Sequence, residues 1–99
     1  MINLSAPHLA MVKNILKEHV SDCEVRVFGS RVTQQVKPYS DLDLLLIAPQ
    51  KIPLTVMIHL KEAFEESDLP FRVDLLDWHT LSDSFKKVID KKYEILQKA

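Results

Sequence analysis

The chain has 99 residues but contains only one glycine, only one cysteine and no long hydrophobic run. The single cysteine, Cys23, excludes an internal disulfide and any metal site that needs several cysteines. No apolar stretch approaches the roughly 20 residues that a membrane-spanning helix needs. The first residues lack the basic start and apolar centre of a signal peptide. We therefore expect a cytoplasmic protein in which Cys23 is a buried, unreactive thiol.

The charges nearly cancel, because 13 basic residues face 14 acidic ones and the net charge is −1. A chain of this charge creates no long-range field, so we expect no extended contact with nucleic acid and none with a membrane. Its four histidines have no paired spacing and no cysteine partners, and they offer no zinc site. A hydrophobic content of 46% is typical of a globular protein, and we expect one domain over residues 1–99.

The hydrophobic pattern predicts helices that alternate with strands. The expected helices cover residues 7–20, 30–36, 54–68 and 80–96. The expected strands cover residues 23–28, 41–48 and 71–76. This order, α-β-α-β-α-β-α, predicts an α/β (α+β) fold in which flanking helices pack on a small mixed sheet of three to four strands.

Two helices have recognisable starts. Ser5 is expected to cap the first helix, and the segment Thr80 to Asp83 resembles a capping box that opens the last one. We expect the last helix to carry Tyr93 as an amphipathic packing residue. The apolar residues that it should turn inward are Phe85, Val88, Ile89 and Leu96.

The only glycine, Gly29, directly precedes Ser30 and falls between the strand 23–28 and the helix 30–36. Backbone N–H groups and a hydroxyl at the start of a helix attract phosphate, and glycine permits close approach to an anion. Taken alone, the pair could also be an ordinary turn. A Walker A loop and a dinucleotide-binding loop are excluded, since both require further glycines. Because the other turns use other residues, we expect glycine to be required at this position.

Three aspartates interrupt the predicted strands. Asp41 and Asp43 open one strand, where their side chains point to the same face and their α-carbons are about 6.5 Å apart. Asp74 lies in the next strand. Neighbouring negative charges at a buried strand are costly without a cation. Oxygen ligands favour Mg²⁺ or Mn²⁺ over zinc. If the two strands are adjacent, the three carboxylates converge on metal ions that assist in-line displacement at phosphorus.

The alternative is that these aspartates only stabilise the fold. Asp41 and Asp43 would then cap a turn, and Asp74 would pair with a basic residue such as Arg26 or Arg72. The coincidence of three aspartates with a Gly-Ser pair favours the metal site.

The segment Gly29-Ser30-Arg31, followed at this spacing by Ser40-Asp41-Leu42-Asp43-Leu44, resembles the G-S-R…S-D-x-D-L signature of minimal nucleotidyltransferase (MNT) domains. These domains belong to the superfamily that includes DNA polymerase beta. The resemblance covers the core from about Val25 to Asp74. It implies the nucleotidyltransferase fold, which is similar to the polymerase beta palm.

The resemblance also implies roles for individual residues. The nucleotide-binding residues would be Gly29, Ser30 and Arg31. The catalytic and metal-binding residues would be Asp41, Asp43 and Asp74. Of these, Asp74 would also help to deprotonate an acceptor hydroxyl. The cofactor would be Mg²⁺ or Mn²⁺, with ATP as the substrate.

MNT domains of this kind commonly pair with a small helical HEPN-domain protein, often an RNase toxin. Some of them transfer AMP from ATP to a tyrosine of that toxin and so act as its antitoxin. The resemblance therefore implies an adenylyltransferase with a HEPN-domain partner. The other assembly that we consider is a homo-oligomer, in which a second copy of the chain would form the missing wall of the acceptor site.

Two further functions remain open from the sequence. One is a non-catalytic module that neutralises its partner by complex formation, and the other is transfer to a small molecule or an RNA end. Family members often continue with a second arginine and a second glycine after the G-S-R motif. Here the corresponding residues are Val32, Thr33 and Gln34, which favours the non-catalytic module to some degree.

Overall fold

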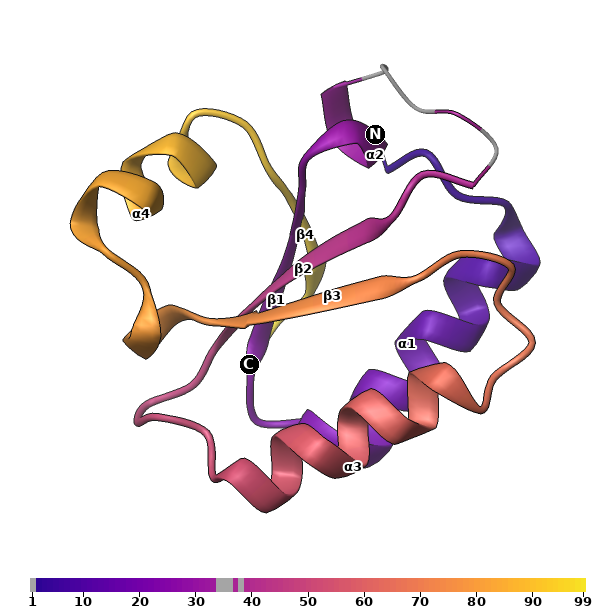
Figure 1. Ribbon diagram of the computed structural model, residues 1–99, viewed down its shortest axis with the longest axis horizontal. Coiled ribbons are helices and arrows are strands. Elements are labelled where there is room, and N and C mark those ends of the chain that lie inside the picture. Colours follow the sequence, from indigo (N-terminus) through magenta and orange to yellow (C-terminus); the bar gives the residue numbers. More distant parts are fainter. Residues whose placement is uncertain (1, 34–36, 38) are drawn as a thin grey trace.

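The computed structural model describes residues 2–33, 37 and 39–99, and Figure 1 shows their arrangement around one sheet. The elements in chain order are α1 (Ala6–Val20), β1 (Glu24–Phe28), α2 (Ser30–Thr33), β2 (Leu42–Ile47), α3 (Leu54–Glu65), β3 (Val73–Asp77), the short 3₁₀ helix η1 (Trp78–Thr80), α4 (Asp83–Asp90) and β4 (Glu94–Gln97). In the predicted helix 30–36, residues 34–36 lie outside the described residues.

The four strands have the order β3-β2-β1-β4. β1 is antiparallel to β2 and to β4, whereas β2 and β3 are parallel. Parallel neighbours need a crossover connection, and α3 supplies it. The sheet is mixed, as the sequence predicts, and β3 and β4 form its two edges, but β4 is not among the predicted strands.

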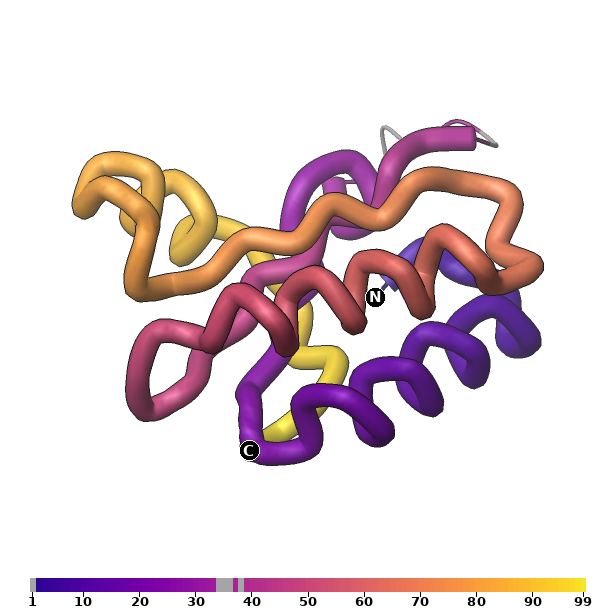
Figure 2. The backbone as a smooth tube through the Cα atoms, turned by 60° about the horizontal axis from the view of Figure 1, so that its bottom comes forward, coloured from indigo at the N-terminus to yellow at the C-terminus, as the bar shows by residue number. Residues whose placement is uncertain are grey.

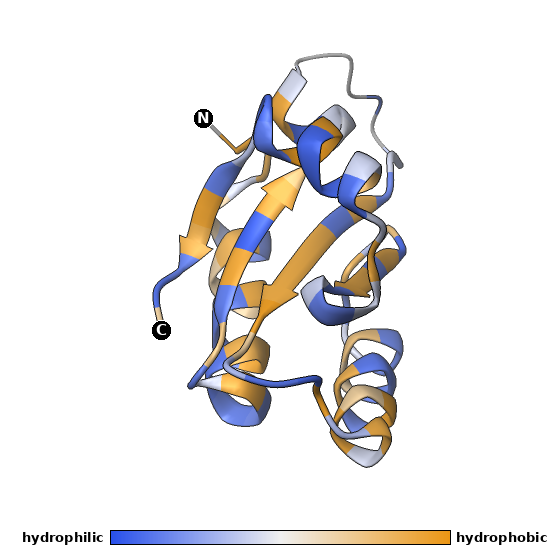
Figure 3. Ribbon diagram, turned by 90° about the vertical axis from the view of Figure 1, so that its left-hand side faces the viewer, coloured by the Kyte–Doolittle hydropathy of each residue, from blue (hydrophilic) through white to orange (hydrophobic). Residues whose placement is uncertain are grey.

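Helices α1 and α3 lie side by side on one face of the sheet, as Figure 2 shows. Their buried residues meet alternate residues of the strands, which is the pattern expected when one strand face points inward. The core on this face includes Val12, Leu16, Val25, Val27, Leu42, Leu44, Leu46, Leu60 and Phe64. Apart from Asp43, β2 consists of hydrophobic residues, and Figure 3 shows this strand mostly orange beside β1, in which orange and blue alternate.

The helix starts agree with the sequence for α1 but not for α4. Oγ of Ser5 accepts a hydrogen bond from N–H of His8 at 3.3 Å, so the predicted cap is confirmed. In α4 the cap is Ser82, whose Oγ accepts from N–H of Phe85 at 3.2 Å. Thr80 belongs to η1 instead, where its hydroxyl donates to the carbonyl of Asp77. The last helix therefore begins later than predicted.

The predicted helix over residues 80–96 is wrong in its second half. α4 ends at Asp90, and the next segment forms β4 on the outer edge of β1. Gln97 holds this strand, because its amide nitrogen donates to the carbonyls of Val20 and Cys23 at 2.9 Å each. Leu96 is buried as predicted, but from a strand.

The inward face predicted for the last helix is also only partly correct. Ile89 is buried, whereas Phe85 and Val88 are exposed. Tyr93 lies after α4, and the guanidinium of Arg26 stacks over its ring at 4.3 Å. Because α4 is short and contacts the face of the sheet opposite to α1 and α3, it leaves apolar side chains open to solvent.

The thiol of Cys23 is buried, as predicted. Burial, followed by the negative charges of Asp22 and Asp77, raises the pKa of this thiol to about 11. In the part of the chain that the structure describes, no helix has the length and hydrophobicity needed to span a membrane.

Candidate active site

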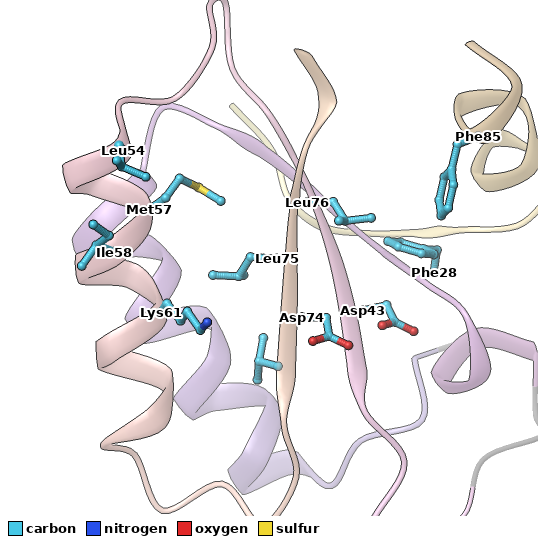
Figure 4. Close-up of a pocket in the computed structure, with 11 residues that line it drawn as sticks. Phe28, Asp43, Leu54, Met57, Ile58, Lys61, Asp74, Leu75, Leu76 and Phe85 are labelled. Atoms are coloured by element: carbon cyan, nitrogen blue, oxygen red, sulfur yellow. The ribbon is translucent and has the colours of Figure 1, made fainter. Parts of the chain in front are cut away.

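Asp43 and Asp74 lie opposite each other in the register of the parallel strands β2 and β3. Their neighbour Leu42 is in the core, so the two carboxylates occupy the other face of the sheet. Figure 4 shows both carboxylates close together in the wall of one groove. The adjacency of the two strands, which was the condition for the carboxylates to converge, is met.

Asp43 has an unusual pKa because of this placement. Burial, followed by the negative charges of Asp74 and Asp41, raises the pKa of Asp43 to about 6. Each of these causes disfavours the ionised carboxylate unless positive charge is brought near it. A cation bound beside Asp43 would therefore stabilise its ionised carboxylate.

Arg72 provides positive charge at the edge of this cluster. Its Nη2 lies 2.9 Å from Oδ2 of Asp41, and its Nε lies 3.4 Å from Oδ1 of Asp74. The hydrogen bond to Asp41, followed by the charges of Asp41 and Asp74, raises the pKa of Arg72. The pairing of Asp74 with Arg72, considered from the sequence as an alternative, does occur. It is an exposed ion pair of the kind that contributes little to stability, so a divalent cation can compete with it.

Across residues 2–33, 37 and 39–99, no three acidic, histidine or cysteine side chains are close enough to form a ready metal site. Asp41 is paired with Arg72 and does not join Asp43 and Asp74. The donor set itself fits a hard cation, since it consists of carboxylate oxygens that repel one another. A site with three carboxylates would require the Asp41 side chain to leave Arg72 and to approach Asp43 and Asp74.

Gly29 lies directly against the carboxylate of Asp43. β1 ends at Phe28, which pairs with Asp43, and the chain turns away at Gly29 with φ of +77°. A Cβ atom at this position would lie 2.3 Å from Oδ2 of Asp43. Both the backbone conformation and the lack of space require glycine here. The sequence-based expectation for this residue is confirmed.

Ser30 begins α2 immediately after this turn. The carbonyl of Gly29 accepts hydrogen bonds from the N–H groups of Val32 and Thr33 at 3.1 and 3.2 Å, which close the short helix. The structure thus brings the Gly-Ser turn next to Asp43. Their role in nucleotide binding stays a prediction.

Arg31 points away from the groove. Its side chain is buried, and it donates to the carbonyl of Ser40 at 2.7 and 3.2 Å and to the carbonyl of Asn3 at 3.1 Å. Its guanidinium also stacks over Phe71 at 4.4 Å, and burial lowers the pKa of Arg31. The resemblance to MNT domains implies a nucleotide contact for Arg31, and this orientation does not favour that contact. Arg31 instead fixes the segment that leads into Asp41.

The sequence did not reveal the other walls of the groove. They come from β1, α3 and α4 and surround a volume of about 720 Å³ together with the two carboxylates. The residues in these walls include Phe28, Leu54, Ile58, Lys61 and Phe85. Only Phe28, next to the glycine, had a position in the sequence that pointed to the site.

Comparisons with known proteins identify the family of this chain from its sequence. Residues 10–99 match the family described as "Polymerase beta, Nucleotidyltransferase". Over 96 residues the chain is 48% identical to the Haemophilus influenzae protein named "Probable protein adenylyltransferase MntA", and the match covers 97% of this chain and 84% of that protein.

Two solved structures have the same fold. A toxin–antitoxin crystal structure with AMP-PNP gives a TM-score of 0.76 at 18% identity and covers 92% of this chain and 73% of that chain. A complex of tri-AMPylated Shewanella oneidensis HEPN toxin with an MNT antitoxin gives a TM-score of 0.65 at 18% identity, with the same two coverages. At such identities the likeness concerns the fold alone. The sequence matches show that this chain belongs to the polymerase beta nucleotidyltransferase family.

Proposed function

We propose that this chain is a protein adenylyltransferase that transfers AMP from ATP to a hydroxyl of a HEPN-domain toxin and thereby acts as its antitoxin. The observation that carries the proposal is the pairing of Asp43 with Asp74 beside Gly29, in a chain 48% identical to a protein named as an adenylyltransferase. The HEPN partner is supported by the fold neighbour that contains an AMPylated HEPN toxin. Because ATP is the donor, we place the reaction in the cytoplasm.

The reaction is an in-line transfer at the α-phosphorus of ATP. The hydroxyl oxygen of the acceptor, a tyrosine in our proposal, forms a bond to the α-phosphorus. The bond between that phosphorus and the oxygen bridging to the β-phosphate breaks, and pyrophosphate leaves. Asp74 accepts the proton from the hydroxyl, while the N–H and hydroxyl groups of Gly29 and Ser30 hold the phosphates.

Asp41, Asp43 and Asp74 would hold Mg²⁺ or Mn²⁺, which fits their oxygen donors and their mutual repulsion. The bound ion would neutralise charge on the phosphate oxygens as it develops. Asp43 must be ionised to act as a ligand, and its pKa of about 6 means that it loses its proton just below neutral pH. Asp41 must also exchange its ion pair with Arg72 for the new cation.

A labelling experiment tests this function. The chain is incubated with Mg²⁺, with ATP labelled at the α-phosphate, and with the HEPN-domain protein encoded beside its gene. We expect the label to appear on the HEPN-domain protein and to be lost in Asp41→Asn and Asp43→Asn. If the parent transfers no label and both variants still neutralise the toxin, the enzymatic function is wrong.

The second candidate function is neutralisation by complex formation without transfer. The burial of Arg31 favours it, because this orientation takes an arginine of the nucleotide-binding motif away from the groove. The same experiment separates the two functions, since a binding module would act equally well without ATP. If the label appears on RNA or on a small molecule but not on protein, that molecule is the acceptor in place of the HEPN-domain protein.

A further inference from the structure

The groove beside the carboxylates contains a free strand edge. β3 ends the sheet and, among the residues that the structure describes, pairs only with β2. N–H of Leu42 donates to the carbonyl of Arg72 at 2.9 Å, which fixes the hydrogen-bonding pattern of this parallel pair. Asp74 therefore directs its backbone groups toward β2. The N–H and carbonyl groups of Val73 and Leu75 point to the outer edge.

Exposed apolar side chains border this edge on both sides. On α3, Leu54 is 74% exposed and Ile58 is 45% exposed. On α4, Phe85 is 42% exposed, and its ring meets that of Phe28 edge to face with 6.3 Å between centroids. All four line the groove that contains the two carboxylates, as Figure 4 shows. Apolar side chains gathered in one groove are typical of a surface that binds a partner.

Lys61 adds a positive charge to the α3 wall of the groove. Within the described part of the chain, its ammonium group takes part in no ion pair. The groove therefore combines the two carboxylates with an unpaired cation, apolar side chains and a strand edge. An acidic side chain on the bound partner would complement Lys61.

We propose that an extended segment of the acceptor protein binds along β3 as an additional strand and carries the hydroxyl that receives AMP. This inference rests on the proposed adenylyl transfer. Side chains alternate along a strand, so one set would face Asp74 and Phe85 while the other set would contact Leu54 and Ile58. The acceptor hydroxyl belongs to the first set, and its two neighbours in sequence are apolar. A carboxylate of the segment lies near Lys61.

The position of the edge selects this occupant over others. An acceptor hydroxyl has to reach the carboxylates of Asp43 and Asp74, and the free edge and these carboxylates belong to one groove. β3 has five residues, Val73–Asp77, and offers about 17 Å of backbone at 3.3 Å per residue. Backbone hydrogen bonds would supply affinity, and the side-chain contacts would supply specificity.

Variants with a matched control test the docking. Ile58→Glu places a charge in the groove, and Ile95→Glu places one on β4 at the other sheet edge, where Ile95 is 46% exposed. We expect Ile58→Glu to raise the KM for the HEPN-domain protein about tenfold or more while the Kd for ATP stays within about twofold. Ile95→Glu should leave both unchanged. Leu54→Glu should repeat the effect of Ile58→Glu.

Equal transfer by the parent and Ile58→Glu, or equal loss in Ile95→Glu, would overturn the docking proposal and leave the transfer function intact. Absence of transfer by the parent would refute the function instead. Amide hydrogen exchange then tests the docking independently of activity. The N–H groups of Val73 and Leu75 should exchange about tenfold more slowly when the HEPN-domain protein is bound, and the outer amides of β4 should not change.

Two outcomes of these measurements contradict the added strand. One is a stable complex in which the exchange of Val73 and Leu75 is unchanged. The other is self-association of the isolated chain, measured by light scattering, that Ile58→Glu abolishes. In that case the groove joins two copies of this chain and is not available to the acceptor.

Discussion

The α-carbon of Gly29 faces the carboxylate of Asp43 so closely that an added methyl group would lie 2.3 Å from Oδ2. The same residue has a φ of +77°, which other residues rarely adopt. The turn at Gly29 and the carboxylate of Asp43 therefore leave no room for a side chain at position 29. A larger residue would have to displace either the backbone that leads into Ser30 or the side chain of Asp43.

Gly29→Ala is therefore expected to reduce both stability and transfer. Backbone strain and the clash with Asp43 together should lower the free energy of unfolding by about 1–3 kcal/mol. Transfer of AMP should fall more strongly than stability, because the displaced carboxylate is a predicted ligand. Urea unfolding and the labelling assay measure the two effects.

Ser30→Ala is the control for this change, since it alters the adjacent residue without introducing a clash. It should unfold at nearly the same urea concentration as the parent. A Gly29→Ala protein with parental stability and parental transfer would show that the loop tolerates a side chain and that the close contact has no functional consequence.

Arg72 is expected to compete with divalent cations. In Arg72→Gln, Asp41 and Asp74 lose their positive partner, so both become available as ligands. Binding of Mn²⁺ in the absence of nucleotide should then become several-fold tighter at pH 7.5, as measured by titration calorimetry. The free energy of unfolding should change little because the ion pairs are exposed.

Arg26→Gln is the matched control for Arg72→Gln. Arg26 also pairs with two carboxylates, those of Glu24 and Asp90, but it does not contact the aspartates of the site. Its replacement should leave the affinity for Mn²⁺ unchanged. If Arg72→Gln weakens Mn²⁺ binding instead, Arg72 helps to position the ligands and is not a competitor.

The sequence predicted the centre of the site because local patterns determine it. Asp43 and Asp74 each interrupt an apolar strand, and a helix between two strands joins them as parallel neighbours. Gly29 was recognisable because the chain has no other glycine. These features depend on residue type and spacing, so no tertiary contact was needed to find them.

The parts that the sequence missed depend on contacts between distant segments. The segment of β4 has apolar residues that also suit a helix, and pairing with the free edge of β1 decides in favour of a strand. Arg31 is buried because the carbonyls of Ser40 and Asn3 meet around it, which no local pattern indicates. The groove walls likewise come from three separate elements.

The pKa of Asp43 predicts a specific dependence of stability on pH. The pKa is about 6 in the folded protein and 3.8 is its ordinary value, so between these pH values the folded state holds a proton that the unfolded state lacks. The stabilisation from this proton is complete below about pH 4 and is lost as the pH rises through 6. Above pH 6, without metal, the ionised Asp43 should therefore destabilise the fold.

Asp43→Asn should remove this effect. In metal-free buffer the variant should gain about 1–2 kcal/mol over the parent at pH 7.5, a value reduced from the full shift because solvent screens a partly exposed group. The gain should shrink as the pH falls from 6 to 4. Urea unfolding at several pH values measures it, with Asp83→Asn as an exposed control on α4. A difference that does not vary with pH would contradict the raised pKa.

Arg31 is expected to stabilise the loop before the carboxylates through a geometry that only arginine provides. Its guanidinium donates to two carbonyls and stacks on Phe71, whereas a lysine has a single ammonium group and cannot make the same set of contacts. Arg31→Lys should therefore lower the free energy of unfolding by about 1 kcal/mol, since the partly buried hydrogen bonds to the carbonyls of Ser40 and Asn3 are lost. The exposed Arg72→Lys should change it far less. If Arg31→Lys keeps parental stability but weakens ATP binding, the side chain must turn toward the groove when nucleotide binds, and the motif's arginine would contact phosphate after all.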